Sequence, residues 1–300
     1  MAAAIQSKGS PICVGIDPRL EKMPAPLLDR FRAQAPQGCG CGRKEVAECF
    51  EEFSAAIIDA VAPHAAAVKL QLACFEQYGP PGFKAFRHLV RRAAKAGLIV
   101  IADAKRGDIG LSAQAYSSAF IGSPAGMNGP LRGLEIDALT VNPLFGQDGL
   151  EPFLDDCRRH GKGIFVLVKT SNPGSAQLQD LRLENGSLWY EHLAGLVDGW
   201  GAGLIGAEGY SSVGAVVGAT HPEAIGRLRQ LMPRAFFLLP GYGAQGAGAA
   251  DVAAAFDCDG LGALVTASRS IIYAVSDADF AAAAGEAARR MKEELWSALG

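Results

Sequence analysis

Short, nearly continuous apolar runs alternate along the chain with longer segments in which apolar residues recur at helical spacing. Runs of this kind are typical of parallel strands that are buried on both faces. We predict eight strands: Ile12–Asp17, Ala66–Leu72, Leu98–Asp103, Ala138–Asn142, Ile164–Lys169, Gly214–Gly218, Phe236–Pro240 and Ala263–Thr266. The helical pattern is clearest in Val46–Val61, Phe83–Ala96, Pro222–Leu231 and Asp277–Leu299.

Eight strand–helix pairs in 300 residues predict an α/β fold of the (β/α)₈ TIM-barrel type, as a single domain over residues 1–300. No charged or Ser/Pro-rich linker divides the chain. We interpret the Pro/Gly-rich stretches near 33–42 and 122–133 as loop insertions. The sixth pair is the weakest, because glycines interrupt the pattern between Leu183 and Tyr210. A doubly wound open sheet is the alternative fold.

The composition, with 49% hydrophobic and 20% charged residues, is typical of a soluble globular protein. A formal net charge of −3 gives no electrostatic reason to expect binding to nucleic acid or to an anionic membrane. We find no run as long as a membrane span and no signal-peptide core, so we expect a cytoplasmic protein. The seven cysteines are scattered, and Cys39 and Cys41 form a lone CxC without the second pair that a zinc site needs.

Several charged side chains occur where a buried strand should be apolar. Lys69 lies within AAAVKLQL, Asp103 and Lys105 end LIVIADAK, and Asp108 follows. Asp103 and Lys105 are two residues apart, so on an extended strand they would point to the same face. Buried lysines need nearby carboxylates, so we expect these four groups to pair at the carboxyl end of the barrel, where active sites of this fold lie. A purely structural set of ion pairs is the alternative, but four such charges on adjacent strand ends favour catalysis.

Five segments, in this order, resemble the orotidine 5′-monophosphate decarboxylase family, in particular its bacterial branch with longer loops. They are CVGIDPRL, VKLQLACFEQYG, IADAKRGDIG, VKTSNPGS and LPGYGAQGA, closed by TASRSIIY. The resemblance covers nearly the whole chain. It implies decarboxylation of orotidine 5′-monophosphate (OMP) to uridine 5′-monophosphate (UMP) and CO₂ with no cofactor and no metal, the last step of UMP biosynthesis.

The resemblance also implies roles for individual residues. A charged tetrad would consist of Lys69, Asp103, Lys105 and Asp108, with Asp108 reaching into the neighbouring subunit's site in a homodimer. Lys105 would stabilise negative charge on the ring carbon and then supply a proton. Asp103 would lie against the substrate carboxylate. The implied substrate-binding residues are Asp17 for a ribose hydroxyl, Ser171 for the pyrimidine ring, Gln245 and Arg269 for the 5′-phosphate, and Ser112, which stands where many relatives have threonine.

Other functions fit part of the pattern. Lys169 ends IFVLVK and resembles the Schiff-base lysine of some class I aldolases, although an aldolase leaves the DAKRGD cluster unexplained. The glycines of GYGAQG spell a weak dinucleotide signature, which we interpret as a phosphate-gripping loop. Magnesium-dependent sugar-phosphate decarboxylases and hexulose-phosphate synthases share the fold and the DxKxxD motif but need a metal. A non-catalytic nucleotide sensor would bind UMP without turning over OMP.

Overall fold

The computed structural model describes residues 1–35, 42–243 and 245–299. Eight parallel strands form a closed barrel, which confirms the predicted (β/α)₈ fold and excludes the open doubly wound sheet. The order around the barrel is β1, β10, β9, β8, β7, β6, β3 and β2. Their bounds are β1 Ile12–Ile16, β2 Ala67–Gln71, β3 Ile99–Arg106, β6 Ala138–Val141, β7 Gly163–Lys169, β8 Ser211–Val217, β9 Ala235–Pro240 and β10 Ala263–Ala267.

The helices follow the strands in the expected alternation. They are α1 Ala2–Lys8, α2 Ala25–Gln34, α3 Arg43–Val61, α4 Leu72–Glu76, α5 Pro80–Lys95, α6 Gly110–Phe120, α7 Gly146–His160, α8 Ala176–Gln179, α9 Trp189–Gly201, α10 Pro222–Leu231, α11 Ala249–Val252, α12 Arg269–Ile272 and α13 Phe280–Leu299. α5 begins earlier than predicted, at Pro80, because proline is favoured in the first turn, where its missing N–H is not needed. Within the described ranges, we find no helix that is both long enough and apolar enough to cross a membrane.

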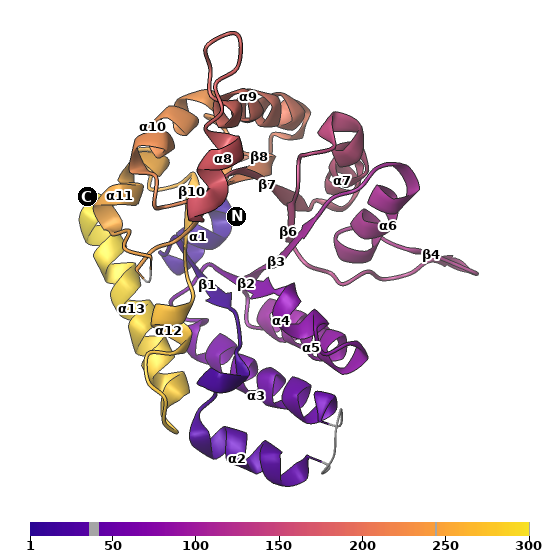
Figure 1. Cartoon of the computed structure of the whole chain (residues 1–300), viewed down its shortest axis with the longest axis vertical. Helices are drawn as coiled ribbons and strands as arrows, with labels where there is room; N and C mark the ends of the chain where they lie inside the picture. The colour runs from indigo at the N-terminus through magenta and orange to yellow at the C-terminus, as the bar shows by residue number, and fades with distance from the viewer. Residues whose placement is uncertain (36–41, 244, 300) are drawn as a thin grey trace. The chain divides into compact units, whose positions relative to one another are not determined.

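The chain divides into two compact units. Unit 1 consists mainly of Ala3–Ala104 with Ala267–Ser297, and unit 2 of Lys105–Thr266. In unit 1, β2 pairs in parallel with β1 and with β3, which places Gly15 opposite Lys69 and Gln71 opposite Asp103. α3 packs against α2 and α5 (Figure 1). A fully buried aromatic group fills the space between these helices and strands: Phe50, Phe53, Phe75 and Phe86.

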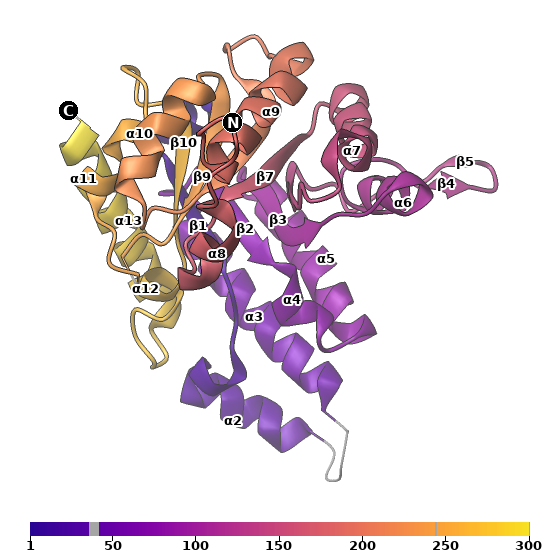
Figure 2. The same cartoon turned by 45° about the horizontal axis from the view of Figure 1, so that its top comes forward.

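In unit 2, β6, β7, β8, β9 and β10 pair in parallel, each with the next. α6 packs against α7, and α9 packs against β7 and β8. The stretch near 122–133 contains a short antiparallel hairpin, β4 Ala125–Gly126 and β5 Gly129–Pro130, which extends away from α6 (Figure 2). Most of the stretch near 33–42, including Cys39 and Cys41, lies outside the described residues. A single domain with two loop insertions stays a prediction.

Two strands differ from their predicted extent. β8 begins at Ser211 rather than Gly214, after a glycine-rich connection that hides the start of the strand in the sequence. β3 continues past Asp103 to Arg106 and therefore carries Lys105 within the strand. Among the predicted site residues, Asp103 and Lys105 thus lie near the end of β3, and Asp17 lies directly after β1.

Candidate active site

Unit 1 contains a buried cluster of charges at the carboxyl ends of β1, β2 and β3. The Lys69 Nζ lies 2.7 Å from Asp103 Oδ2 and 3.8 Å from Asp17 Oδ1. Gln71 Nε2 also donates to Asp103 Oδ2, at 3.1 Å. The side chains of Lys69 and Asp103 are only 7% and 8% exposed. The parallel register aligns Gln71 with Asp103 and places Lys69 two residues earlier on β2, from where its long side chain reaches both carboxylates.

The two carboxylates determine the charge of Lys69. Burial alone would lower the pKa of Lys69, but the attraction of Asp103 and Asp17 outweighs burial and raises that pKa above its ordinary value. Lys69 is therefore an ammonium at neutral pH. Asp17 Oδ1 is buried, and no donor among the described residues forms a hydrogen bond with it. The cation nearest to this oxygen is the Lys69 ammonium, at 3.8 Å.

The loop that carries Asp17 is fixed by Tyr273, a residue to which the sequence assigned no role. The Tyr273 hydroxyl accepts a hydrogen bond from the Arg19 N–H at 2.7 Å and donates one to the Asp17 carbonyl at 3.2 Å. Its ring stacks on Phe53, with centroids 5.7 Å apart. Burial raises the pKa of Tyr273, so the phenol keeps its proton. Arg269 begins α12 in the same segment, with its side chain exposed.

The backbone conformation and the exposure of Lys105 differ from the prediction. Its φ of 48° lies in the left-handed region, which costs a residue with a Cβ about 1–2 kcal/mol. The simple alternation of an extended strand therefore does not hold at Lys105, and its side chain is exposed rather than buried. The buried Thr140 on β6 supports this conformation, because its Oγ1 accepts the Lys105 N–H at 2.9 Å.

Asp108 and Ser112 lie on the connection from β3 to α6. Asp108 is half-buried, and its Oδ1 accepts the N–H of Ile109 at 2.8 Å. Ser112 is exposed in the first turn of α6. A Cβ added to Gly149 of α7 would lie 3.0 Å from the Asp108 carbonyl oxygen and 2.7 Å from Phe145 Cβ. Gly149 therefore allows Asp108 and Phe145 to approach the same point on α7.

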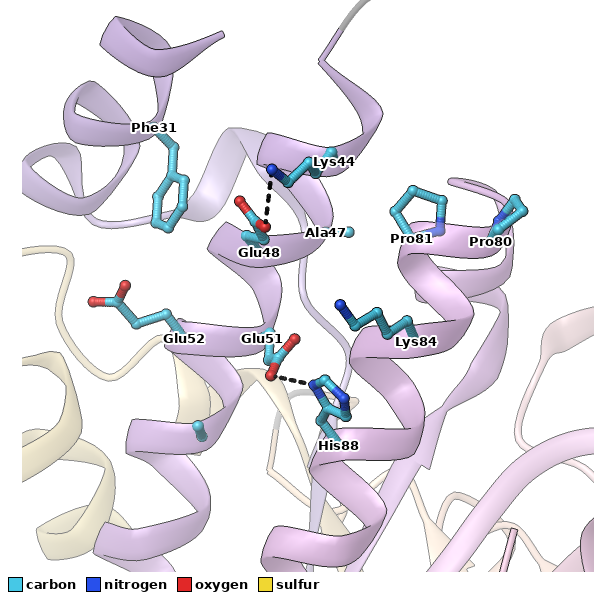
Figure 3. A pocket seen from close by; sticks show the side chains of 11 residues that line it. Phe31, Lys44, Ala47, Glu48, Glu51, Glu52, Pro80, Pro81, Lys84 and His88 are labelled. Carbon is cyan, nitrogen blue, oxygen red and sulfur yellow. Dashed lines mark hydrogen bonds and ion pairs between the residues drawn. The ribbon is translucent and has the colours of Figure 1, made fainter. Parts of the chain in front are cut away.

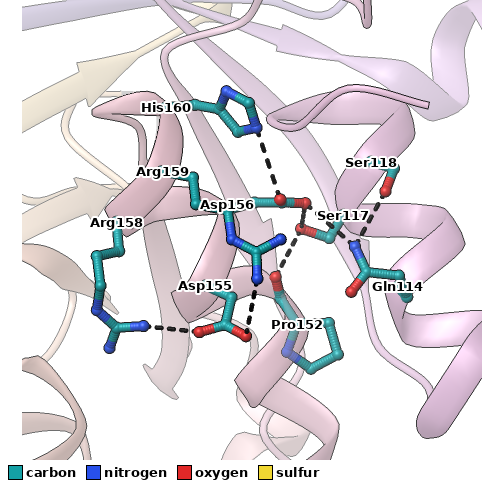
Figure 4. A network of polar contacts seen from close by, with 9 residues as sticks. All are labelled: Gln114, Ser117, Ser118, Pro152, Asp155, Asp156, Arg158, Arg159 and His160. Carbon is teal, nitrogen blue, oxygen red and sulfur yellow. Dashed lines mark hydrogen bonds and ion pairs between the residues drawn. The ribbon is translucent and has the colours of Figure 1, made fainter. Parts of the chain in front are cut away.

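A buried polar network holds α6 against α7 (Figure 4). Asp156 Oδ2 lies 2.6 Å from Ser117 Oγ and 3.5 Å from Gln114 Nε2. His160 Nε2 lies 3.7 Å from the other carboxylate oxygen. Because the Asp156 side chain is only 5% exposed, these contacts compensate for its desolvation and set the position of α6.

Ser171 and Gln245 both lie near Gly241 in unit 2. A Cβ added to Gly241, directly after β9, would lie 3.3 Å from Gln245 Oε1 and 3.7 Å from Ser171 Cβ. Gly241, Gly243 and Gly246 all have positive φ, a backbone conformation that favours glycine. The following helix, α11 Ala249–Val252, is four residues long, which is too short for the phosphate-binding helix of a dinucleotide fold. The glycines are those of a turn-rich loop beside Ser171.

Lys169 has a structural partner. Its buried ammonium forms an ion pair with Asp180 and lies 5.3 Å from the Tyr190 ring centroid. The carboxylate and the ring account for a buried lysine at this position without a covalent role. The aldolase alternative therefore has no observation in its favour.

One further pocket in unit 1 lies apart from the predicted residues. It has a volume of about 730 Å³ between α2, α3 and α5, and two pairs of its polar side chains are in contact (Figure 3). Glu51 Oε1 lies 2.9 Å from His88 Nδ1, and Lys44 lies 3.7 Å from Glu48. Across residues 1–35, 42–243 and 245–299, no three His, Cys, Asp or Glu side chains gather as a metal-binding group. The structure thus brings together Asp17, Lys69 and Asp103 in unit 1, and Ser171 and Gln245 in unit 2; their roles stay predictions.

Comparison with known proteins gives one consistent result. The family model described as "Orotidine 5'-phosphate decarboxylase / HUMPS family" matches residues 10–284. The chain is 47% identical to an orotidine 5′-phosphate decarboxylase of Rhodopirellula baltica, over 95% of this chain and 90% of that one. It is 42% identical to the enzyme of the same name from Caldicellulosiruptor bescii, over 99% and 96%. The solved OMP decarboxylase of Leishmania donovani superposes with a TM-score of 0.72 at 31% identity, over 99% and 98%.

These matches define a class of barrel enzymes, the decarboxylases and synthases of this one family. The chain belongs to the orotidine 5′-phosphate decarboxylase / HUMPS family. The predicted family resemblance is thereby confirmed. Both relatives and the solved structure carry the name of the decarboxylase branch.

Proposed function

We propose that this protein is a carboxy-lyase that converts OMP to UMP and CO₂ with neither a metal nor an organic cofactor. The observation that carries the proposal is the buried cluster of Asp17, Lys69 and Asp103, in a chain 47% identical to a named OMP decarboxylase. In de novo pyrimidine biosynthesis this is the step that yields UMP. We also propose that the protein acts in the cytoplasm, as expected from its sequence.

The chemistry follows from where charge develops. The bond between the pyrimidine ring carbon and its carboxylate breaks, and the electron pair stays on the ring carbon. The Lys105 ammonium stabilises that charge and donates a proton to the carbon; the lysine then recovers a proton from solvent. Asp103 faces the substrate carboxylate and disfavours the ground state relative to the transition state. Lys69 holds Asp103 in place through the 2.7 Å ion pair.

Substrate groups remote from the reacting bond supply binding energy. Asp17 accepts a ribose hydroxyl through its otherwise unbonded Oδ1. Ser171 contacts the pyrimidine ring, and Gln245 with Arg269 holds the 5′-phosphate, for which the planar guanidinium of arginine is well suited. Ser112 keeps a hydroxyl near the start of α6. Binding energy from the phosphate is used to organise the reacting end of the substrate.

We further propose that the protein is a homodimer in which Asp108 completes the partner's site. Large apolar side chains near Asp108 are exposed: Ile109, Leu111, Leu144 and Phe145. Leu111 is 90% and Leu144 is 74% exposed, which is the surface expected where a second subunit docks. A mixture of Lys105→Ala and Asp108→Ala subunits should recover part of the lost activity, because some mixed dimers contain one intact site. Verified heterodimers without any activity would contradict the shared site.

The experiment that tests the activity is conversion of OMP to UMP by purified protein in the presence of a chelator, followed by chromatography of the products. Full conversion supports the metal-free decarboxylase. Activity that disappears with the chelator and returns with magnesium would favour a metal-dependent enzyme of the same family. Tight UMP binding without turnover of OMP would favour the nucleotide sensor.

A further inference from the structure

The segment that follows β7 carries Ser171, and the residue before it is held by a single glutamine from further along the chain. The Thr170 N–H donates to Gln179 Oε1 at 2.9 Å. Gln179 Nε2 donates in return to Thr170 Oγ1, also at 2.9 Å. Both polar ends of the Gln179 amide therefore bind Thr170, one at its backbone and one at its side chain.

Two more side chains hold the same stretch. His221, which precedes α10, lies with its Nε2 3.1 Å from the Thr170 carbonyl oxygen, so this nitrogen carries the hydrogen of that bond. Asp180, next to Gln179, forms the ion pair with Lys169. The backbone N–H and carbonyl of Thr170 are thus both bound by side chains, immediately before Ser171. These two bonds restrain the residue directly before Ser171.

Glycines restrict Ser171 from the other side. A Cβ added to Gly218, at the end of β8, would lie 2.9 Å from both the backbone N and Cα of Ser171. Only glycine permits this approach. A Cβ added to Gly241 would likewise lie 3.7 Å from Ser171 Cβ. Ser171 therefore packs against Gly218, directly after β8, and lies near Gly241, directly after β9, while Gln179 holds the preceding residue, Thr170.

We infer that Gln179 is a positioning residue that fixes Ser171 for recognition of the pyrimidine base. This inference rests on the proposed function, in which Ser171 contacts the base. A hydroxyl that distinguishes a base must stay within a fraction of an ångström of its position. Without Gln179, the Thr170 N–H loses its acceptor and the Thr170 hydroxyl keeps only its bond to Asn172 Oδ1, so the segment moves toward water to replace the lost bonds. The binding affinity should therefore fall for ligands that contain the base and stay unchanged for ligands that contain only the sugar phosphate.

The test compares two glutamines of the same short helix. Gln179 is half-buried and bonded to Thr170, whereas Gln177 is exposed. Binding of UMP and of ribose 5-phosphate is measured by calorimetry for wild type, Gln179→Ala and Gln177→Ala. Loss of two hydrogen bonds, at about 1 kcal/mol each, predicts roughly tenfold or greater weakening of UMP binding by Gln179→Ala. Ribose 5-phosphate binding should stay within about twofold of wild type, and Gln177→Ala should change neither ligand.

A conservative variant adds a second criterion. Gln179→Glu keeps an acceptor for the Thr170 N–H, so it should recover part of the UMP affinity. The ratio of the two affinities in one variant does not depend on how much of the sample is folded. If Gln179→Ala leaves the ratio of the UMP affinity to the ribose 5-phosphate affinity unchanged, for instance because binding of both ligands weakens equally, the inference is overturned. A wild type that decarboxylates OMP while Gln179→Ala keeps the wild-type ratio would defeat this inference alone, whereas a wild type inactive on OMP would defeat the proposed function.

Discussion

Replacing Asp103 with asparagine is expected to destabilise the folded protein strongly, because it leaves Lys69 buried without its nearest carboxylate. At an effective dielectric constant of about 20, the attraction over 2.7 Å is roughly 6 kcal/mol, and the attraction of Asp17 over 3.8 Å is roughly 4 kcal/mol. Burial of the ammonium costs several kcal/mol in the opposite direction. In the wild type the two carboxylates offset this cost. In Asp103→Asn the remaining carboxylate does so only in part, and we expect a loss of about 3–5 kcal/mol in the free energy of unfolding.

Urea unfolding at pH 7, followed by tryptophan fluorescence, measures this loss. Asp59→Asn is the matched control, because Asp59 pairs with Arg92 at the surface and its loss should cost less than about 1 kcal/mol. The double variant Lys69→Met/Asp103→Leu removes the ion pair as a whole and should be more stable than Asp103→Asn, which leaves the buried ammonium behind. An Asp103→Asn variant no less stable than Asp59→Asn would refute the reasoning. The raised pKa of Lys69 means that its contribution is complete below about pH 10.5 and is lost only as the pH rises further.

Three other predictions follow from individual contacts. Thr140→Val removes the acceptor of the Lys105 N–H, so kcat should fall about tenfold with little change in KM, and Thr140→Ser should restore it. Tyr273→Phe removes the hydroxyl that holds the loop carrying Asp17, so the preference for UMP over its deoxyribose analogues should fall. Tyr78→Phe is the control and should leave this preference unchanged, because no hydrogen bond is described for the Tyr78 hydroxyl. Arg229 donates to five backbone carbonyls near the start of β9 and β10, and none of these acceptors is a carboxylate. Arg229→Met should therefore lower the free energy of unfolding by about 3 kcal/mol, while kcat per folded molecule stays unchanged.

The sequence was sufficient for the barrel and for the first part of the site. Apolar runs buried on both faces can only be parallel strands in such an alternation, and parallel strands end at the same edge. The contact of Lys69 with Asp103 could therefore be anticipated from two strand ends. A buried lysine needs nearby carboxylates, and the register of β1 with β2 identifies Asp17 as a second carboxylate beside Lys69.

The remaining parts depend on contacts between residues far apart in sequence. The left-handed backbone of Lys105 accompanies a hydrogen bond to Thr140, 35 residues away, and no local pattern announces it. Tyr273 binds Arg19 across 254 residues. Gln179 ends the four-residue helix α8, which the apolar pattern of the sequence does not predict, and its partner Thr170 follows β7. In these cases tertiary contacts, rather than local preference, decide the geometry.

Lys105→Ala tests the central claim most directly. The rate of absorbance loss of OMP is measured with a chelator present for wild type, Lys105→Ala and the exposed-lysine control Lys95→Ala. Loss of both charge stabilisation and the proton donor predicts that Lys105→Ala slows turnover by about 10³-fold or more, with Lys95→Ala equal to wild type. A wild type without activity, or a Lys105→Ala variant as active as wild type, would contradict a metal-free decarboxylase centred on Lys105.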